Sequence, residues 1–166
     1  MVELELLGVR VELPSNTPVM LLAEREGRRR RLSIFIGGPE AAAIAFALDG
    51  VEPPRPLTHD LACVLLDNLG ASLERVVITE LRDTTFYADL HVVQPDAEEG
   101  DPPMVVSARP SDAVALAVRT GSPVYATEEL LDEAGYTEEA EDESPDEVVE
   151  EFREFIQNVS PEDFAS

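Results

Sequence analysis

Two short motifs in the sequence contain residue types that can bind phosphate and transfer protons. The first is Arg55-Pro56-Leu57-Thr58-His59-Asp60, and the second is Ala108-Arg109-Pro110-Ser111-Asp112-Ala113. Each places an Arg and a Pro before a hydroxyl residue and an acid, at the predicted start of a helix. The N–H groups and partial positive charge of a helix N-terminus attract anions, and a guanidinium adds a planar fork that matches phosphate. The pattern predicts that phosphate is bound by Arg55, Thr58, Arg109, Ser111 and Arg119.

The same motifs supply candidates for catalysis. His59 can accept or donate a proton near neutral pH, as a general base or acid. Asp60 and Asp112 carry the carboxylate oxygens that Mg²⁺ and Mn²⁺ prefer, and a bound ion of this kind can activate water. We therefore predict His59, Asp60 and Asp112 as catalytic residues, with the two aspartates as metal ligands.

A structural interpretation of both motifs stays open. Thr58 and Ser111 are typical N-cap residues, and acids in the first helical turn stabilise the helix dipole by about 0.3–1 kcal/mol. Arg109 can pair with a carboxylate inside the fold. The chain would then be a non-catalytic, oligomeric binding module whose acidic tail engages a basic partner. Geometry distinguishes the two: catalysis needs His59, Asp60 and Asp112 in one exposed cleft, whereas a structural network buries and pairs them.

Charge is the abnormal feature of the composition. The chain has 35 acidic and 12 basic residues, a net charge of −23, and every basic residue is Arg. Residues 127–166 hold one Arg and 16 acids, so the end of the chain carries most of the excess. Such a protein repels a phosphate backbone unless positive charge is gathered locally. The one concentrated run, Arg28 to Arg31, is either a solvated turn or a contact for phosphate or an acidic partner.

The remaining composition bounds the class of protein. At 166 residues and 44% hydrophobic content, the chain fits one domain with a tail. A single Cys63 excludes an intrachain disulfide and a Cys-based zinc site. There is no apolar run of about 18 residues and no signal-like N-terminus, so we expect a cytoplasmic protein.

Periodicity and turn residues predict an α+β fold with a mixed or mostly antiparallel sheet. We expect a domain over 1–135, an acidic linker over 136–145 and an acidic C-terminal helix and tail over 146–166. Two stretches, 34–42 and 105–113, resemble each other, and each has a Gly eleven residues after its Pro. They suggest a β-β-β-α unit used twice. The predicted strands are 4–13, 19–24, 32–36, 74–81, 86–93, 103–108 and 123–126, and the predicted helices of the domain are 40–48, 58–69, 111–119 and 128–134.

With both motifs in this order, the sequence resembles the bifunctional nuclease (BFN) domain family. Supporting stretches are Ile34-Phe35-Ile36-Gly37 with Glu40-Ala41, and Phe86-Tyr87-Ala88, and the likeness runs from Val2 to Gly135. The resemblance implies an α+β fold, self-association with a dimer favoured, and RNase and DNase activity. The leading hypothesis is a metal-assisted nuclease with nucleic acid as substrate, whose residue roles rest on this chain's own motifs.

Overall fold

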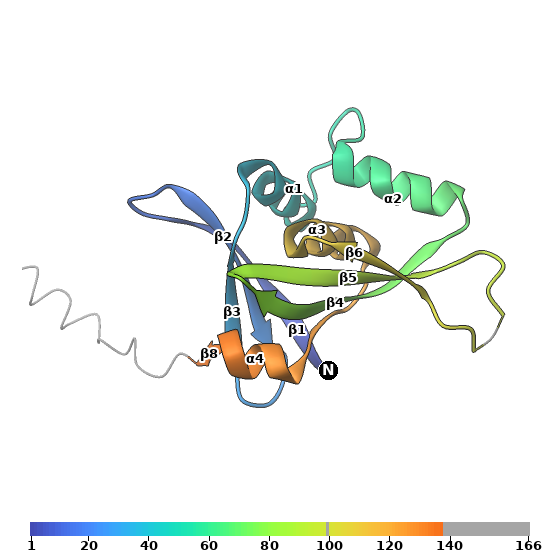
Figure 1. Ribbon diagram of the computed structural model, residues 1–166. Coiled ribbons are helices and arrows are strands. Elements are labelled where there is room, and N and C mark those ends of the chain that lie inside the picture. The colour runs from blue at the N-terminus through green and yellow to red at the C-terminus, as the bar shows by residue number, and fades with distance from the viewer. Residues whose placement is uncertain (99, 138–166) are drawn as a thin grey trace, which may run out of the picture.

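The computed structural model describes residues 1–98 and 100–137, which form one mixed sheet with four helices packed on it (Figure 1). The predicted α+β fold is confirmed. The predicted C-terminal helix and residues 138–145 of the predicted linker lie outside the described residues. The strands are β1 (Val2–Glu12), β2 (Thr17–Glu24), β3 (Arg30–Phe35), β4 (Ser72–Arg82), β5 (Thr85–Val93), β6 (Met104–Ala108), β7 (Val124–Ala126) and β8 (Tyr136–Thr137). The helices are α1 (Gly38–Leu48), α2 (Thr58–Asn68), α3 (Pro110–Thr120) and α4 (Glu128–Ala134).

The sheet is built from two three-stranded antiparallel meanders. Its order is β6-β5-β4-β7-β1-β2-β3-β8, so each meander runs outward from the centre. β7 joins them, parallel to β4 and antiparallel to β1. α1 follows the first meander and α3 the end of the second, which is the predicted β-β-β-α order occurring twice. A duplication as the origin of this order stays a hypothesis.

The helices differ in how far they are buried. α3 buries seven of its eleven residues, because it packs on β4 and β5 and is flanked by α1 and α2. α2 lies outside α3 and has no buried residue. α1 and α2 lie at one end of the sheet, and α4 lies at the other (Figure 1). α3 therefore anchors the predicted site, and α2 forms its outer layer.

Alternation along the strands explains the core. In β2, Met20 and Leu22 point inward and are fully buried, and Val76 and Ile78 do the same in β4. Burial of a side chain of this kind is worth about 1.5–3 kcal/mol. Leu130 and Leu131 bring α4 into the same cluster, which fixes the helix on the sheet.

One detail differs from the sequence prediction. Tyr136 and Thr137 do not begin a linker: they form β8, which pairs with Arg31 and Arg30 of β3. A two-residue strand has too little periodicity to be recognised in a sequence.

Among the described residues, no helix has both the length and the apolar character needed to cross a membrane.

Candidate functional site

The candidate site lies where the helices α1, α2 and α3 meet. Arg109 is the N-cap residue of α3 and is extended, because Pro110 follows it at the first helical position. α1 begins in the same way after Gly37, with Pro39 in its first turn and Glu40 next to it. His59 and Asp60 stand in the first turn of α2. Each short motif thus brings a helix start, with its polar residues, to the same region.

The two motifs are in direct contact. His59 Nε2 lies 2.9 Å from Asp112 Oδ1, a hydrogen bond that joins α2 to α3. Arg109 Nε donates to Asp112 Oδ2 at 2.6 Å, and its Nη2 donates to Glu40 Oε1 at 2.8 Å. The two motifs, which are about fifty residues apart in the sequence, therefore meet in space. These contacts form a continuous chain of polar groups, Glu40–Arg109–Asp112–His59.

Arg119 ties the three helices together behind this chain. Its Nε donates to Asp60 Oδ1 at 2.6 Å, and its Nη1 and Nη2 donate to the carbonyl oxygens of Ala115 and Ala43. The Arg119 side chain is only 11% exposed, so these bonds lie away from bulk water. We call the six residues together the helix-start network: Glu40, His59, Asp60, Arg109, Asp112 and Arg119.

The network keeps its aspartates ionised. For Asp112, burial alone would raise the pKa, but hydrogen bonds from Arg109 and His59 outweigh it and lower the pKa below the usual range. For Asp60, the bond from Arg119 and the backbone N–H of Leu57 lower the pKa. The pKa of the Arg109 guanidinium is raised by its bonds to Asp112 and Glu40. Both aspartates thus stay negative, and their charges are matched by protein cations.

Three predicted residues play no part in the network. Arg55 is exposed on the loop before α2, and no residue in the described part of the chain forms an ion pair with it. The interpretation of Thr58 and Ser111 as N-caps is wrong. The N-cap residues are Leu57 and Arg109, because each is the last extended residue before its helix. Neither of them makes a side-chain capping hydrogen bond. In α2, Asp60 accepts from the Leu57 N–H at 2.9 Å instead.

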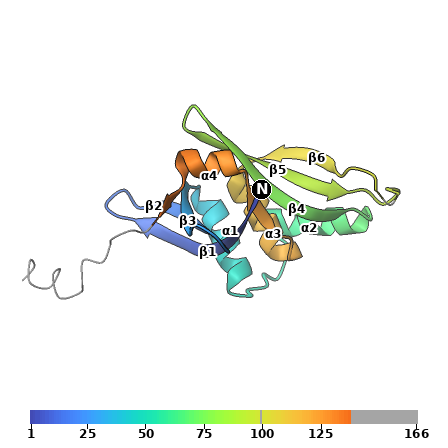
Figure 2. The same cartoon turned by 90° about the horizontal axis from the view of Figure 1, so that it is seen from below.

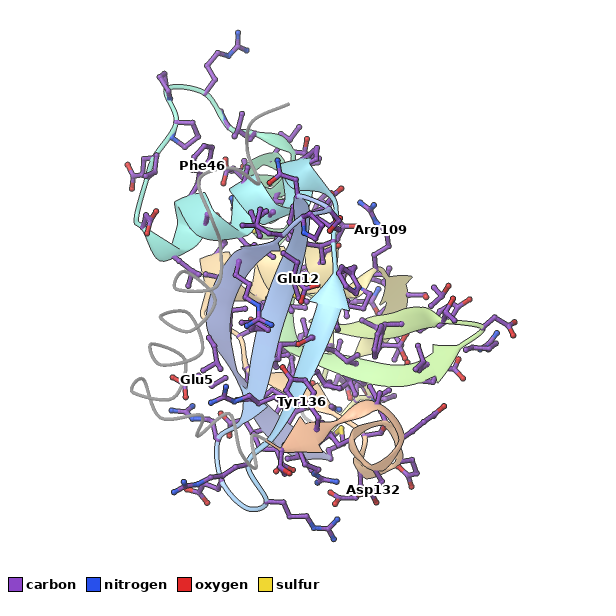
Figure 3. All side chains as sticks on the ribbon, turned by 90° about the vertical axis from the view of Figure 1, so that its left-hand side faces the viewer. Glu5, Glu12, Phe46, Arg109, Asp132 and Tyr136 are labelled. Carbon is purple, nitrogen blue, oxygen red and sulfur yellow. The ribbon has the colours of Figure 1, made fainter. Side chains whose placement is uncertain are left out.

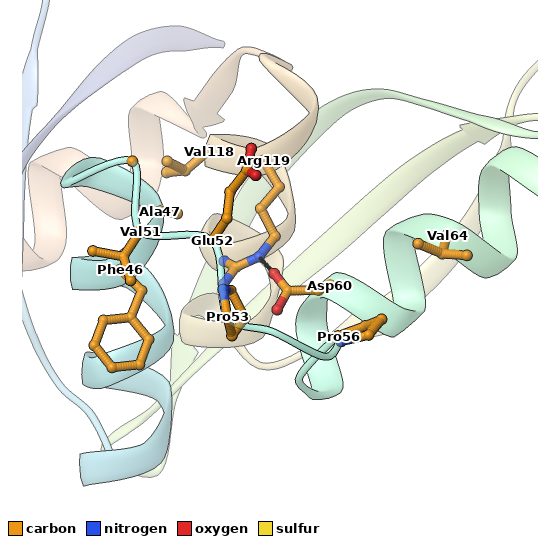
Figure 4. A pocket seen from close by; sticks show the side chains of 11 residues that line it. Phe46, Ala47, Val51, Glu52, Pro53, Pro56, Asp60, Val64, Val118 and Arg119 are labelled. Carbon is orange, nitrogen blue, oxygen red and sulfur yellow. Dashed lines mark hydrogen bonds and ion pairs between the residues drawn. The ribbon is translucent and has the colours of Figure 1, made fainter.

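Two hollows flank the network. One, of about 580 Å³, lies between the end of α1, the loop after it and the start of α2, with Asp60 and Arg119 in its wall beside Phe46 and Pro56 (Figure 4). The other, of about 370 Å³, is lined by Arg109 and Ser111 together with the end of β3 and the β4–β5 turn. Neither His59 nor Asp112 is among the residues that line these two hollows.

The predicted metal ligands do not form a ready ion site. Both oxygens of Asp60 and both oxygens of Asp112 already bond to protein groups. In the part of the chain that the structure describes, no group of three or more His, Cys, Asp and Glu side chains is arranged to hold an ion. A divalent ion would have to share these oxygens with two guanidiniums. The metal prediction therefore stays a prediction, with no residue set that fits it in this arrangement.

Glu40 is the partner that the site prediction omitted. It is largely buried and reaches across from α1 to Arg109. The carboxylate also folds back over its own helix start, since a Cβ at residue 37 would collide with Oε2 of Glu40. The matched order of Gly37-Gly38-Pro39-Glu40 and Arg109-Pro110-Ser111-Asp112 was the available signal. It places an acid in the first turn of each of two packed helices.

The run from Arg28 to Arg31 takes part in a separate network at the other end of β3. Arg30 is 8% exposed and donates to Glu24, Glu128 and Asp132, at 2.5–2.9 Å. Glu24 is a buried acid whose pKa burial would raise, but the bonds from Arg30 lower it. The pKa of Arg30 is raised by the same bonds. This part of the run is structural: it holds α4 against the hairpin.

Comparison with known proteins places the chain in a family. The Bifunctional nuclease domain matches residues 20–139, which include both motifs. Two relatives from Mycobacterium tuberculosis are each 49% identical over 168 residues, covering 98% of this chain and 97% of theirs. They are the "Uncharacterized protein MT1877" of strain CDC 1551 / Oshkosh and the "Uncharacterized protein Rv1829" of strain ATCC 25618 / H37Rv. The match covers most of the described sheet and all four helices, and the chain therefore belongs to the bifunctional nuclease domain family.

Proposed function

We propose that the chain is a nuclease that hydrolyses phosphodiester bonds of RNA, DNA or both, with His59 as its proton-transfer residue. The observation that supports this most is the 2.9 Å bond from His59 Nε2 to Asp112. A carboxylate on one ring nitrogen fixes the tautomer and leaves the other nitrogen to act on substrate. His59 Nδ1 has no hydrogen-bond partner among the described residues and is not one of the fully buried unsatisfied atoms.

The proposed step uses this free nitrogen. His59 Nδ1 takes a proton from the attacking water molecule as the water oxygen bonds to phosphorus, and the bond from phosphorus to the leaving oxygen breaks. The imidazolium then returns the proton to the leaving oxygen, so the ring ends neutral. Asp112 stays ionised and stabilises the imidazolium, which is the role that its lowered pKa favours. General acid–base transfer of this kind contributes about 10²–10⁴-fold to a rate.

Phosphate would be held by Arg55 and Arg109, the two exposed arginines of the short motifs. Arg109 is 66% exposed, although both its pairs with carboxylates limit the charge it can offer. Arg55 has no ion-pair partner in the described residues and stands four residues before His59. Thr58 and Ser111 stand near these arginines and can donate from their hydroxyls. Arg119, bound on three sides, is a positioning residue for Asp60 rather than a phosphate ligand.

The test compares full-length wild type with His59→Gln and Asp112→Asn, on labelled single-stranded RNA and DNA. We expect both variants to lose activity by 10²-fold or more. The matched control is His91→Gln, which removes the only other imidazole, on β5. Equal rates for wild type, His59→Gln and Asp112→Asn, with all of them folded, would refute the proposal.

Metal assistance is a separate part of this proposal. Loss of cleavage in EDTA, with recovery in Mg²⁺ or Mn²⁺, would support it, and Asp60→Asn would then weaken the recovery. Unchanged cleavage in EDTA would leave the imidazole to act without a metal. A salt dependence is expected in either case, because the attraction of arginine to phosphate is screened.

The alternative function is a non-catalytic binding module. It is favoured by the pairing of every oxygen of Asp60 and Asp112 with protein groups, as in a structural network. Binding of a labelled oligonucleotide without cleavage, with affinity unchanged by His59→Gln, would support this alternative. The acidic tail would then engage a basic partner.

We also propose that the protein is a homodimer formed through the outer face of α2. Leu57, Leu61, Val64, Leu65 and Leu69 share this face, and all are exposed. A helix that is apolar on its solvent side is typical of a buried element. In an antiparallel pair of α2 helices, Arg55 at one end meets Asp67 and the negative helix terminus of the other copy. Few charges stand on this face, so it is where two acidic chains repel each other least.

Light scattering of full-length protein tests the dimer. We expect about twice the chain mass of 18.1 kDa for wild type, and a monomer for Leu61→Glu with Leu65→Glu. Val105→Glu, on the exposed edge strand β6, is the matched control and should leave the dimer intact. A monomeric wild type at micromolar concentration, or loss of the dimer only in Val105→Glu, would contradict this interface.

A further inference from the structure

A hollow at the end of the β2–β3 hairpin is lined by four of the twelve arginines of the chain. Its volume is about 440 Å³. Arg25, Arg28, Arg29 and Arg31 line it, and Ala23, Glu24 and Thr137 complete the wall. We call it the arginine hollow. Four guanidiniums around one hollow are unusual in a chain of net charge −23, and together they make an anion site in outline.

The positive charge of the hollow is only partly matched. Arg25 and Arg28 are exposed, and each uses Nη1 to bond a carboxylate, on Glu3 and Asp132 respectively. Arg29 forms no ion pair within residues 1–98 and 100–137. Glu24, the acid in the wall, is 1% exposed and is bonded by Arg30 from the inside. Arg25 also lies near Glu5 and Glu26. The donors left without an acid are therefore those of Arg29 and the remaining N–H groups of Arg28.

The chain leaves the described part of the fold at this hollow. Thr137 pairs with Arg30, Tyr136 pairs with Arg31, and the Tyr136 hydroxyl lies 2.7 Å from Ser33 Oγ. Figure 3 shows Tyr136 and Asp132 beside the hairpin turn at the bottom of the view. The exit point is therefore fixed on the edge of β3, and Thr137 itself lines the hollow.

The residues that follow carry the complementary charge. Residues 138–143 read Glu-Glu-Ala-Glu-Asp-Glu, five carboxylates in six residues. Since a chain spans at most about 3.3–3.6 Å per residue, all six lie within about 22 Å of Thr137. A tether this short gives an effective concentration in the millimolar range, which an untethered polyanion rarely matches.

We propose that the arginine hollow is the docking site of residues 138–143 of the same chain. The acidic run forms ion pairs with Arg25, Arg28 and Arg29, and an outside polyanion, such as a nucleic acid backbone, must displace it to bind there. This interaction is independent of the nuclease proposal, because it involves no residue of the helix-start network. It gives the acidic run a local partner in an otherwise repelling surface.

The test keeps the full chain and neutralises the run in place. The variant carries Glu138→Gln, Glu139→Gln, Glu141→Gln, Asp142→Asn and Glu143→Gln. The matched control makes the same charge change farther along, with Glu150→Gln, Glu151→Gln, Glu154→Gln, Glu162→Gln and Asp163→Asn. NMR of the arginine Nε–H groups reports on Arg25, Arg28 and Arg29. Anisotropy with a dye-labelled oligothymidylate of about twelve nucleotides, in EDTA, reports on polyanion binding.

We expect the arginine signals to shift in the variant and hardly at all in the control. Wild type in about 0.5 M NaCl should show the same shifts, because salt of this strength screens charges beyond about 4 Å. The variant should bind the oligonucleotide about tenfold more tightly than wild type, and Arg28→Gln with Arg29→Gln should remove that gain.

Three results would overturn the proposal. Unchanged arginine signals in the variant would mean that the run does not touch the hollow. Equal gains in oligonucleotide binding for variant and control would mean that only total charge matters. Shifts that depend on protein concentration would assign the contact to the acidic run of a second copy. Loss of nuclease activity in His59→Gln affects none of these readouts.

Discussion

The helix-start network and the arginine-rich end of the β2–β3 hairpin lie at opposite ends of β3 and use arginine in opposite ways. In Figure 3 Arg109 lies near the top, and the hairpin turn lies at the bottom. In the network, two arginines meet three carboxylates, and each guanidinium bridges elements. In the hairpin, five arginines stand near six acids, Glu3, Glu5, Glu24, Glu26, Glu128 and Asp132. Both arginines of the first region are paired, whereas in the second Arg29 forms no ion pair among the described residues.

Figure 2 shows the molecule turned by 90° about the horizontal axis, with β1–β3 on one side of the view and β4–β6 on the other. The network joins these halves on the helix side through α1 and α3, whereas the hairpin network joins β3 to α4. The comparison teaches that local arginine density does not identify a catalytic site. A guanidinium whose N–H donors all bond to neighbouring elements stabilises the fold, whereas one with free donors can bind a ligand.

The largest expected effect is at the buried centre of the hairpin network. Arg30→Ala leaves Glu24 buried without its bonded guanidinium, and leaves Glu128 and Asp132 with Arg28 as their remaining cation. Breaking a buried ion pair in this way costs about 3–5 kcal/mol in the free energy of unfolding. Urea unfolding of full-length protein measures it. Arg29→Ala, one residue away and exposed, is the matched control and should stay within about 0.5 kcal/mol. Equal stability of both variants would show that the Arg30 pairs are not structural.

A second prediction separates the two arginines of α3. Arg119→Ala removes three hydrogen bonds from a largely buried side chain, and leaves Asp60 with only the Leu57 N–H. We expect a loss of about 2–3 kcal/mol, since bonds to charged groups are worth about 1.5–3 kcal/mol each but are not additive. Arg109→Ala, at an exposed position, should cost about 1 kcal/mol or less. A larger loss for Arg109 would mean that the exposed half of the network carries the fold.

Much of this organisation was predictable from local residues. Each helix begins near a Pro, Thr or acid that marks it, and Gly121 takes a left-handed φ of 71° after α3, as a helix-ending Gly does. The alternation of apolar and polar residues in β2 and β4 predicted these two strands. Their order in the sheet was not predictable, because β7 and β8 are two or three residues long and are placed by tertiary pairing alone.

Five of the six residues of the helix-start network could be named from the sequence, but the pairs that they form could not. His59 and Asp112 are far apart in the sequence, and no local rule states that an imidazole in α2 meets a carboxylate in α3. Glu40 was visible as an acid at a helix start, but its bond to Arg109 depends on how α1 and α3 pack. Arg28 to Arg31 read as a single run, yet Arg29 is exposed in the turn with a φ of 59°, whereas Arg30 is the first residue of β3 and is buried on Glu24.

A third prediction concerns acid. The pKa of Asp112 is lowered in the folded protein, so ionised Asp112 adds stability that is fully present above its ordinary value of 3.8. This stability is lost as the pH falls through the lower folded pKa. Asp112→Asn should therefore be less stable than wild type by about 1 kcal/mol near pH 6, and the difference should shrink below pH 4. Thermal unfolding from pH 6 to pH 3 measures it, with Asp96→Asn, in the exposed loop after β5, as the control.

The smallest expected effect is at the rim of the hairpin network. Arg28 bonds Asp132 at 3.0 Å and lies 3.9 Å from Glu128, and both partners are well exposed. Exposed ion pairs contribute about 0–1 kcal/mol, because water screens them and two long side chains lose freedom. Arg28→Gln should therefore change the urea midpoint only slightly, and the change should vanish at high salt. Its effect on oligonucleotide binding by the neutralised variant should be far larger than its effect on stability. A large loss of stability, insensitive to salt, would place Arg28 with Arg30 in the structural class and reduce the arginine hollow to a part of the fold.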